Sequence, residues 1–184
     1  IFMFINHKSI KMKKVFLLVT SILVASTLSA QTLVFNIQEF KAKKGKPKIC
    51  FIPTATGDLE LYKLNYYATF SNLNCQPTHL DFFKRTPNLE KLIHDQDAIF
   101  VGGGNTKSML AVWRDWGLDE ILKQAYEKGS VMSGVSAGAI CWFERGITDS
   151  WAENLKVMDC LNFVSGVCCP HYDEEPERRP SVHK

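Results

Sequence analysis

Short apolar runs alternate with longer segments of mixed polarity along most of the chain. The apolar runs are bounded by proline, glycine or polar residues, which is typical of buried strands. The mixed segments carry apolar residues at helical spacing. The expected strands are 48–55, 78–83, 98–105, 130–135 and 162–169, and the expected helices are 58–73, 88–95, 106–128 with an interruption at Gly117 and an end at Gly129, and a helix start at 137–143.

Strands that alternate with helices indicate an α/β domain, in which a parallel sheet carries helices on both faces. The first expected helix is indicated by apolar residues at positions 59, 62, 66, 70 and 73. Asp58 precedes these positions and is expected to cap the helix start. The predicted fold class is therefore a three-layer α/β sandwich built on a parallel sheet.

Three clusters of glycine or polar residues follow expected strands. They are GGGNT at 102–106, GVSAG at 134–138 and CPHYDEE at 169–175. In parallel α/β sheets the functional residues gather at the carboxyl ends of the strands. This rule places the three clusters at one edge of the sheet, although they are far apart in sequence, so we expect a functional site there.

The second cluster matches G-x-S-x-G, the nucleophile elbow, with Ser136 at its centre. In an elbow a strand turns abruptly into a helix, and the serine has a strained backbone. Gly134 and Gly138 are needed there because side chains would collide with the adjacent backbone. The N–H groups at the helix start point toward any oxyanion that forms. The alternative interpretation is a tight structural turn.

The glycine run 102–104 and Asn105 end the third expected strand. A dinucleotide fingerprint requires glycine at the position of Lys107, and no Walker A sequence follows, so neither kind of cofactor site is expected. Bare glycine backbone is instead suited to present N–H groups to an oxyanion beside Ser136. A plain strand-to-helix turn is the alternative.

His171 follows the last expected strand and is the best candidate for a general base, because a serine hydroxyl needs an imidazole to accept its proton. A structural histidine is the alternative. A carboxylate is expected to orient the imidazole. Spacing alone does not choose among the candidate acids, which are Asp149, Asp159, Asp173, Glu174 and Glu175.

Hydrophobic residues make up 46% and charged residues 22% of the 184 residues, which fits one soluble globular domain. This composition excludes a disordered, collagen-like or coiled-coil protein. The formal net charge of +3 arises within residues 1–30, which hold four lysines and no acidic residue. The rest of the chain is nearly neutral, so its charge gives no reason to expect nucleic-acid binding.

Residues 12–30 show the pattern of a secretory signal peptide: lysines, an apolar run at 15–24, and small residues ending at Ala30. The apolar run is shorter than the roughly 20 residues of a membrane span, and an N-terminal membrane anchor is the alternative. Residues 1–11 are interpreted as upstream sequence translated in frame. We therefore expect an exported protein, periplasmic or secreted, without stable membrane association after cleavage.

The sequence context of the cysteines predicts that they are buried and do not serve as metal ligands or redox-active thiols. Four of them lie within or beside apolar runs and are expected to behave as small hydrophobes. One structural disulfide is the alternative in an exported chain. No CxxC pair is present, so zinc and thioredoxin-type sites have no support. The six cysteines are Cys50, Cys75, Cys141, Cys160, Cys168 and Cys169.

At these motifs the chain resembles the peptidase E family of serine peptidases, whose fold is similar to class I glutamine amidotransferase domains. The matching stretches are KICFIPTATGD at 48–58, AIFVGGGNT at 98–106, GVSAGAICWFERGITDS at 134–150 and CPHYDEE at 169–175. The resemblance covers roughly 48–175. The paired GGGN and GxSAGA motifs are quite specific to the family.

The resemblance implies a role for each matching residue. Ser136 would be the nucleophile, His171 the base and Asp149 the triad acid. The oxyanion donors would be backbone N–H groups of Ala137 and of the glycine run, at Gly103 or Gly104. Family members cleave dipeptides with N-terminal aspartate, and their relatives include the cyanophycinases. A small peptide substrate and no metal or cofactor are therefore expected.

Two features depart from the family pattern. The leader sets the chain apart, since peptidase E proper is cytoplasmic in character, and export leaves open whether this member has the same substrate. Family members also continue for several dozen residues after the histidine segment, whereas this chain stops at Lys184, so we expect the domain to be incomplete at its C-terminus. Asn105 and Arg179 are the candidate substrate contacts, Arg179 because it is suited to pair with an aspartate carboxylate.

The predicted organisation is upstream sequence and signal peptide at 1–30, a polar lead-in at 31–47 and a peptidase E-like domain at 48–184. The predicted function is a serine exopeptidase that acts through an acyl-enzyme. A non-catalytic binding protein of the same fold and a cyanophycinase-like peptidase are the alternatives. Glutamine amidotransfer is disfavoured because the elbow carries Ser136 rather than cysteine. The oligomeric state is left open.

Overall fold

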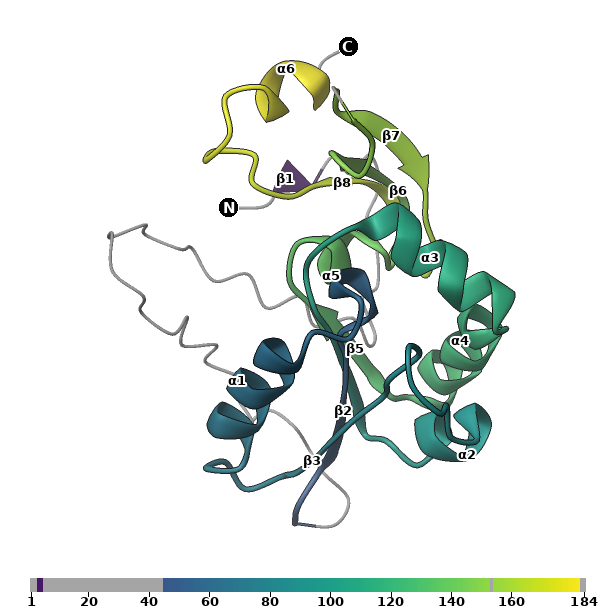
Figure 1. Cartoon of the computed structure of the whole chain (residues 1–184). Helices are drawn as coiled ribbons and strands as arrows, with labels where there is room; N and C mark the ends of the chain where they lie inside the picture. Colours follow the sequence, from purple (N-terminus) through teal and green to yellow (C-terminus); the bar gives the residue numbers. More distant parts are fainter. Residues whose placement is uncertain (1–2, 5–44, 153, 183–184) are drawn as a thin grey trace.

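The computed structural model describes residues 3–4, 45–152 and 154–182 (Figure 1). The predicted signal peptide at 12–30 and most of the polar lead-in lie outside the described residues. The strands are β1 (Met3–Phe4), β2 (Lys48–Ile52), β3 (Gln76–His79), β4 (Ala98–Val101), β5 (Val131–Gly134), β6 (Phe143–Thr148), β7 (Lys156–Asp159) and β8 (Val164–Cys169). The helices are the 3-10 turn η2 (Thr54–Thr56), α1 (Glu60–Phe70), α2 (Leu89–His94), α3 (Thr106–Asp115), α4 (Leu118–Lys128), α5 (Ala137–Ile140) and α6 (Arg178–Val182). None of the helices described here combines the length and apolarity needed to cross a bilayer.

Four strands form a sheet in the order β3–β2–β4–β5, and every neighbouring pair in it is parallel. A second group of strands has the order β1–β8–β6–β7. In this group β6 and β8 are parallel, whereas β1 and β7 are antiparallel to their neighbours. The predicted α/β fold with a parallel sheet is confirmed. The last expected strand, β8, belongs to the second group.

The parallel sheet is buried on both faces because side chains alternate along its strands. On β2, Cys50 and Ile52 pack in the core that α2, α3 and α4 complete. Ile49 and Phe51 point to the opposite face, where they pack with Tyr66 of α1. Figure 1 shows α1 on one side of the sheet and α2, α3 and α4 on the other. The fold therefore has the three layers that the sequence predicts.

The helices α3 and α4, which pack against the Cys50 and Ile52 side of the sheet, begin and end where the sequence places capping residues. The side-chain oxygen of Asn105 accepts the Ser108 N–H at 2.8 Å and caps α3. Gly117 separates α3 from α4, and Gly129 ends α4. Both glycines have φ in the left-handed region, at 67° and 110°. The predicted helical stretch 106–128 and its interruption are confirmed.

The start of α1 differs from the prediction. Leu59 occupies the N-cap position, and no side chain caps the helix. Asp58 has φ 59° and its carboxylate accepts the backbone N–H groups of Phe82 and Phe83 instead. The expected cap fails because this carboxylate is used in a tertiary contact.

The buried face of α1 follows its apolar pattern only in part. Tyr66 and Phe70 are buried as expected, but Leu59 and Tyr62 are 48% and 44% exposed. Lys63 occupies the buried position of the first turn, where its ammonium pairs with Asp81. This ion pair joins α1 to the segment after β3, and a hydrophobic pattern does not reveal it.

Two other elements differ from the sequence pattern. β3 ends at His79 rather than continuing through 78–83, because the N–H groups of Phe82 and Phe83 bond to Asp58. After α5 the chain returns at once as β6, which the sequence analysis missed together with β7. A Cβ at Gly146 would lie 3.1 Å from the Ile140 side chain, so β6 packs closely over α5 and a larger residue there would require Ile140 to shift.

All six cysteines are buried and free. Burial raises the pKa of Cys50 to about 12, against a smaller opposing effect of a hydrogen bond with Thr78. Burial likewise raises the pKa of Cys160 to about 12. A thiol that remains protonated is a poor nucleophile, so the expectation that these residues act as small hydrophobes is confirmed.

Candidate active site

Ser136 lies at the sharp turn between β5 and α5. Its backbone has φ 51° and ψ −115°, a strained conformation for any residue other than glycine. A Cβ at Gly134 would lie 2.2 Å from the carbonyl oxygen of Gly138. A Cβ at Gly138 would lie 2.2 Å from the carbonyl oxygen of Val101. Both positions require glycine, as the elbow motif predicts.

His171 approaches Ser136 from the end of β8, although 35 residues separate the two in sequence. Its Nε2 lies 3.1 Å from the Ser136 Oγ. His171 has φ 55°, and the N–H groups of Glu174 and Glu175 donate to its carbonyl oxygen. This turn directs the imidazole toward the elbow. The predicted nucleophile and base therefore meet within hydrogen-bonding distance.

The other imidazole nitrogen of His171 contacts Glu174, which is one of the five candidate acids. Nδ1 lies 3.1 Å from Oε2 of Glu174. Asp149, the acid implied by the family resemblance, pairs instead with Arg178 at 3.5 Å, and its side chain is 72% exposed. The expected contact of Asp149 with His171 is thus not the one found. The turn after His171 brings Glu174 to the ring first, because that carboxylate is only three residues away.

Arg178 is buried, with 2% of its side chain exposed, although the sequence is equally compatible with a solvated surface residue. Its Nε donates to Glu175 at 2.6 Å and its Nη1 to the Ile147 carbonyl oxygen at 3.2 Å. The guanidinium therefore ties the segment that follows His171 to β6. The sequence does not indicate this role, because Arg178 and its neighbour Arg179 look alike in it.

Both candidate substrate contacts have partners within the protein. Asn105 donates from Nδ2 to the Ser150 carbonyl oxygen at 3.1 Å while its oxygen caps α3. Arg179 pairs with Asp173, and its guanidinium lies 5.4 Å from the centre of the Tyr172 ring. Both residues are exposed, and Arg179 has 61% of its side chain accessible to an incoming carboxylate.

Two of the predicted oxyanion residues, Gly103 and Ala137, lie next to Ser136, and Gly104 follows Gly103. A Cβ at Gly103 would lie 3.3 Å from the Ser136 Cβ. Gly104 has φ 131°, and a Cβ there would lie 2.3 Å from the Ala55 carbonyl oxygen, so it also requires glycine. Ala137 is the first residue of α5, where backbone N–H groups have no partner within the helix. The backbone on two sides of Ser136 is thus suited to face an oxyanion.

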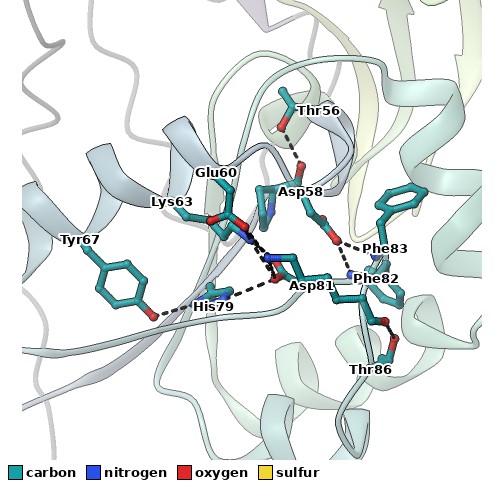
Figure 2. Close-up of polar contacts among 12 residues, drawn as sticks. Thr56, Asp58, Glu60, Lys63, Tyr67, His79, Asp81, Phe82, Phe83 and Thr86 are labelled. Carbon is teal, nitrogen blue, oxygen red and sulfur yellow. Dashed lines mark hydrogen bonds and ion pairs between the residues drawn. The ribbon is translucent and has the colours of Figure 1, made fainter.

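A second polar cluster, which the sequence analysis missed, lies between α1 and the segment after β3 (Figure 2). The Lys63 ammonium lies 3.0 and 2.8 Å from the two carboxylate oxygens of Asp81 and 3.1 Å from Glu60. Burial lowers the pKa of Lys63, but these carboxylates outweigh it and raise the pKa to about 12. We call this group the Lys63 cluster, and it consists of Glu60, Lys63, Tyr67, His79, Asp81 and Lys84. A lysine on an otherwise apolar helix face is the signal that points to it.

Asp58 lies beside the Lys63 cluster (Figure 2) and is only 5% exposed. One carboxylate oxygen accepts the N–H of Phe82 and, at 2.8 Å, the N–H of Phe83. The other oxygen is buried without a hydrogen-bond partner among the described residues. Burial raises the pKa of the Asp58 carboxyl, although the two N–H donors oppose the shift.

Ser136, His171 and Glu174 together form a serine–imidazole–carboxylate arrangement. The imidazole is placed to accept the serine proton, and the carboxylate is placed to stabilise the imidazolium that results. Among the described residues, no group of three or more histidine, cysteine or acidic side chains is placed to hold a metal ion. The chemistry that this geometry suits is nucleophilic attack on a carbonyl carbon.

The sequence matches the family model of peptidase family S51 over residues 16–184. It is 48% identical over 145 residues to the uncharacterized peptidase YgaJ of Bacillus subtilis, an alignment that covers 78% of this chain. The same alignment covers 63% of the Bacillus protein, so the chain spans less than two thirds of that relative. It is 27% identical over 170 residues to the uncharacterized peptidase Lin0382 of Listeria innocua, covering 83% of this chain and 78% of that protein.

Two solved structures share the fold. A peptidase from an acI-B1 actinobacterium has a TM-score of 0.64 at 20% identity, and the alignment covers 80% of this chain and 66% of that one. A protein of Listeria monocytogenes EGD-e with a provisional peptidase E assignment has a TM-score of 0.56 at 23% identity, covering 80% and 79%. At these identities the two structures establish the α/β architecture alone.

Proposed function

The chain belongs to peptidase family S51, and from this membership we propose that it is a serine-type exopeptidase that hydrolyses small peptides. The observation that carries the proposal is the 3.1 Å contact between His171 Nε2 and Ser136 Oγ at a strained elbow. Strain of this kind is retained where the surrounding structure over-determines it, which is common at reactive residues.

In the proposed mechanism the Ser136 Oγ attacks the peptide carbonyl carbon and His171 accepts its proton. The backbone N–H groups of Ala137 and of Gly103 or Gly104 bind the oxyanion. His171 then protonates the departing amine, which leaves an acyl group on Ser136. A water molecule, deprotonated by the same imidazole, releases that acyl group and restores the serine.

We assign the orienting acid to Glu174, whose carboxylate lies 3.1 Å from His171 Nδ1. A carboxylate at this nitrogen holds the imidazole in the tautomer that leaves Nε2 free to accept a proton. Asp149 acts indirectly in this proposal, since it pairs with the Arg178 that anchors the segment after His171. The triad is therefore Ser136–His171–Glu174, with Asp149 as the alternative acid.

The proposed substrates are dipeptides with N-terminal aspartate, as the resemblance to peptidase E implies. Arg179, largely exposed beside Asp173, is the proposed contact for the aspartate carboxylate. Because residues 12–30 have the pattern of a signal peptide, we also propose that the enzyme acts outside the cytoplasm.

The first experiment compares hydrolysis of Asp-Leu and Ala-Leu by the protein expressed from its complete reading frame. We expect release of leucine from Asp-Leu, and a loss of more than about a thousandfold in Ser136→Ala. Circular dichroism of Ser136→Ala checks that the variant folds. No release from either peptide by a folded wild-type protein would contradict the proposed substrate, and undiminished turnover by Ser136→Ala would contradict the proposed nucleophile.

A further inference from the structure

The glycine run beside Ser136 packs against the turn that follows β2. The Asn105 N–H donates to the Ala55 carbonyl oxygen at 2.8 Å. Gly104 passes so close to the same oxygen that a Cβ there would lie 2.3 Å away. Where Ala55 lies therefore determines where Gly103 and Gly104 lie relative to Ser136.

The turn that carries Ala55 spans residues 53–58 and is held at its centre. Its own backbone closes it, since Thr56 and Asp58 both donate N–H groups to the Pro53 carbonyl oxygen, at 3.0 and 3.3 Å. Trp113 of α3 donates from Nε1 to the Thr54 hydroxyl at 3.1 Å in the buried core. These contacts fix the shape of the turn and the position of its N-terminal part, at Thr54.

Asp58 fixes the C-terminal end of the turn. We propose that Asp58 is a positioning residue for the oxyanion side of the active site, because its carboxylate clamps the 53–58 turn that holds the glycine run in place. The clamp consists of the Phe82 and Phe83 N–H groups on one carboxylate oxygen. To reach them Asp58 adopts φ 59° and buries its second oxygen without a partner among the described residues. Such a costly arrangement persists only where the structure requires it.

This inference rests on the proposed function, because it concerns the backbone donors that serve the Ser136 reaction. A donor that shifts by about 1 Å costs on the order of a hundredfold in rate. Substrate binding elsewhere in the site is left intact. Release of the clamp is therefore expected to lower kcat and to leave KM nearly unchanged.

The test variant is Asp58→Gly. Glycine accepts φ 59° without strain, so the variant loses the clamp while the backbone conformation that it occupied becomes easier to adopt. Asp58→Asn is the rescue variant, since asparagine tolerates the left-handed region and keeps one carbonyl acceptor for the two N–H groups. Asn162→Gly is the matched control: Asn162 also has positive φ, 56°, but is exposed and precedes β8.

The first readout is the rate at which a fluorophosphonate labels Ser136, because the tetrahedral adduct places an oxygen where the oxyanion forms. The second is kcat and KM for Asp-Leu. We expect Asp58→Gly to label and turn over about tenfold to a hundredfold more slowly at an unchanged KM. Asp58→Asn is expected to recover to within about threefold of the wild type, and Asn162→Gly to match it.

The outcomes separate the two proposals. Absence of labelling and turnover in the wild-type protein would overturn the proposed function and this inference together. Normal labelling of Asp58→Gly, beside an active wild type, would overturn this inference alone. So would an Asp58→Gly protein that does not fold by circular dichroism, because Asp58 would then support the whole domain rather than the glycine run.

Discussion

Four residues other than glycine have positive φ in the described part of the chain: Asp58, Ser136, Asn162 and His171. Each such conformation costs on the order of 1–3 kcal/mol. Ser136 and His171 are the two whose side chains meet at 3.1 Å. Asp58 joins two loops through its carboxylate. At the scale of the residue, three of these four positions therefore lie at the candidate site or at the turn beside it, whereas Asn162 is exposed and precedes β8.

Substitution of each candidate acid discriminates between them. We expect Glu174→Gln to lower kcat by roughly a hundredfold or more, because the amide no longer stabilises the His171 imidazolium. Asp149→Asn is expected to change kcat by less than about threefold, since Asp149 contacts Arg178 rather than the imidazole. Asp-Leu hydrolysis measured from pH 5 to 9 checks both variants. A larger loss in Asp149→Asn than in Glu174→Gln would return the acid role to Asp149.

At the scale of the element, α1 places one buried charge among its apolar contacts. The helix buries Lys63 beside Tyr66, and leaves Leu61 and Leu64 58% and 65% exposed. The Lys63 ammonium is satisfied by Asp81, whose side chain is itself only 12% exposed. Removal of Lys63 leaves the largely buried Asp81 carboxylate with only its longer contacts to His79 and Lys84, at 3.6 and 3.7 Å.

The docking of α1 can be measured through this pair. We expect Lys63→Met to lower the free energy of unfolding by about 2 kcal/mol, because the largely buried Asp81 carboxylate loses its shortest partner. Urea unfolding monitored by circular dichroism gives the value. Glu60→Gln is the matched control, since Glu60 contacts the same ammonium but is exposed, and its effect is expected to be small. Equal effects of the two substitutions would show that the Asp81 pair does not hold the helix.

At the scale of the whole molecule, the core has two layers separated by the sheet, and buried thiols belong to both. Cys50 lies in the larger layer with Ile99 and Met109, and Cys75 lies in the layer below α1. Burial raises the pKa of both thiols. The stability of the molecule is therefore expected to depend on pH in the alkaline range.

Because burial raises the pKa of Cys50, the free energy of unfolding is expected to fall as the pH rises. The Cys50 pKa rises from 9.0 to about 12 on burial, so its contribution to stability is fully present below pH 9 and is lost as the pH rises toward 12. The loss is about 1.4 kcal/mol per pH unit for this thiol. Urea unfolding of Cys50→Ala between pH 9.5 and 11 is expected to show a slope shallower by this amount. Identical slopes in variant and wild type would contradict the role of this thiol.

Sequence pattern predicted the three layers, most strands and helices, and the approach of His171 to Ser136, but it did not choose the carboxylate beside the imidazole. The glycines that bound Ser136 and break the helices leave a local signal, because backbone crowding and left-handed φ exclude other residues at those positions. The failures were β6, β7 and the end of β3. Their boundaries depend on hydrogen bonds to segments that are distant in sequence, such as that of Asp58 to Phe83.

The sequence by itself thus determined which residue types follow the strands: a glycine run after β4, Ser136 at the elbow after β5, and His171 after β8 of the second group. Only the tertiary structure decided which carboxylate meets the imidazole, where Arg178 lies and which loop holds the glycine run. The physical reason is that a local motif is specified by the steric limits of neighbouring residues. A charge partner, in contrast, is chosen by distances of a few ångströms between segments that only the folded chain brings together.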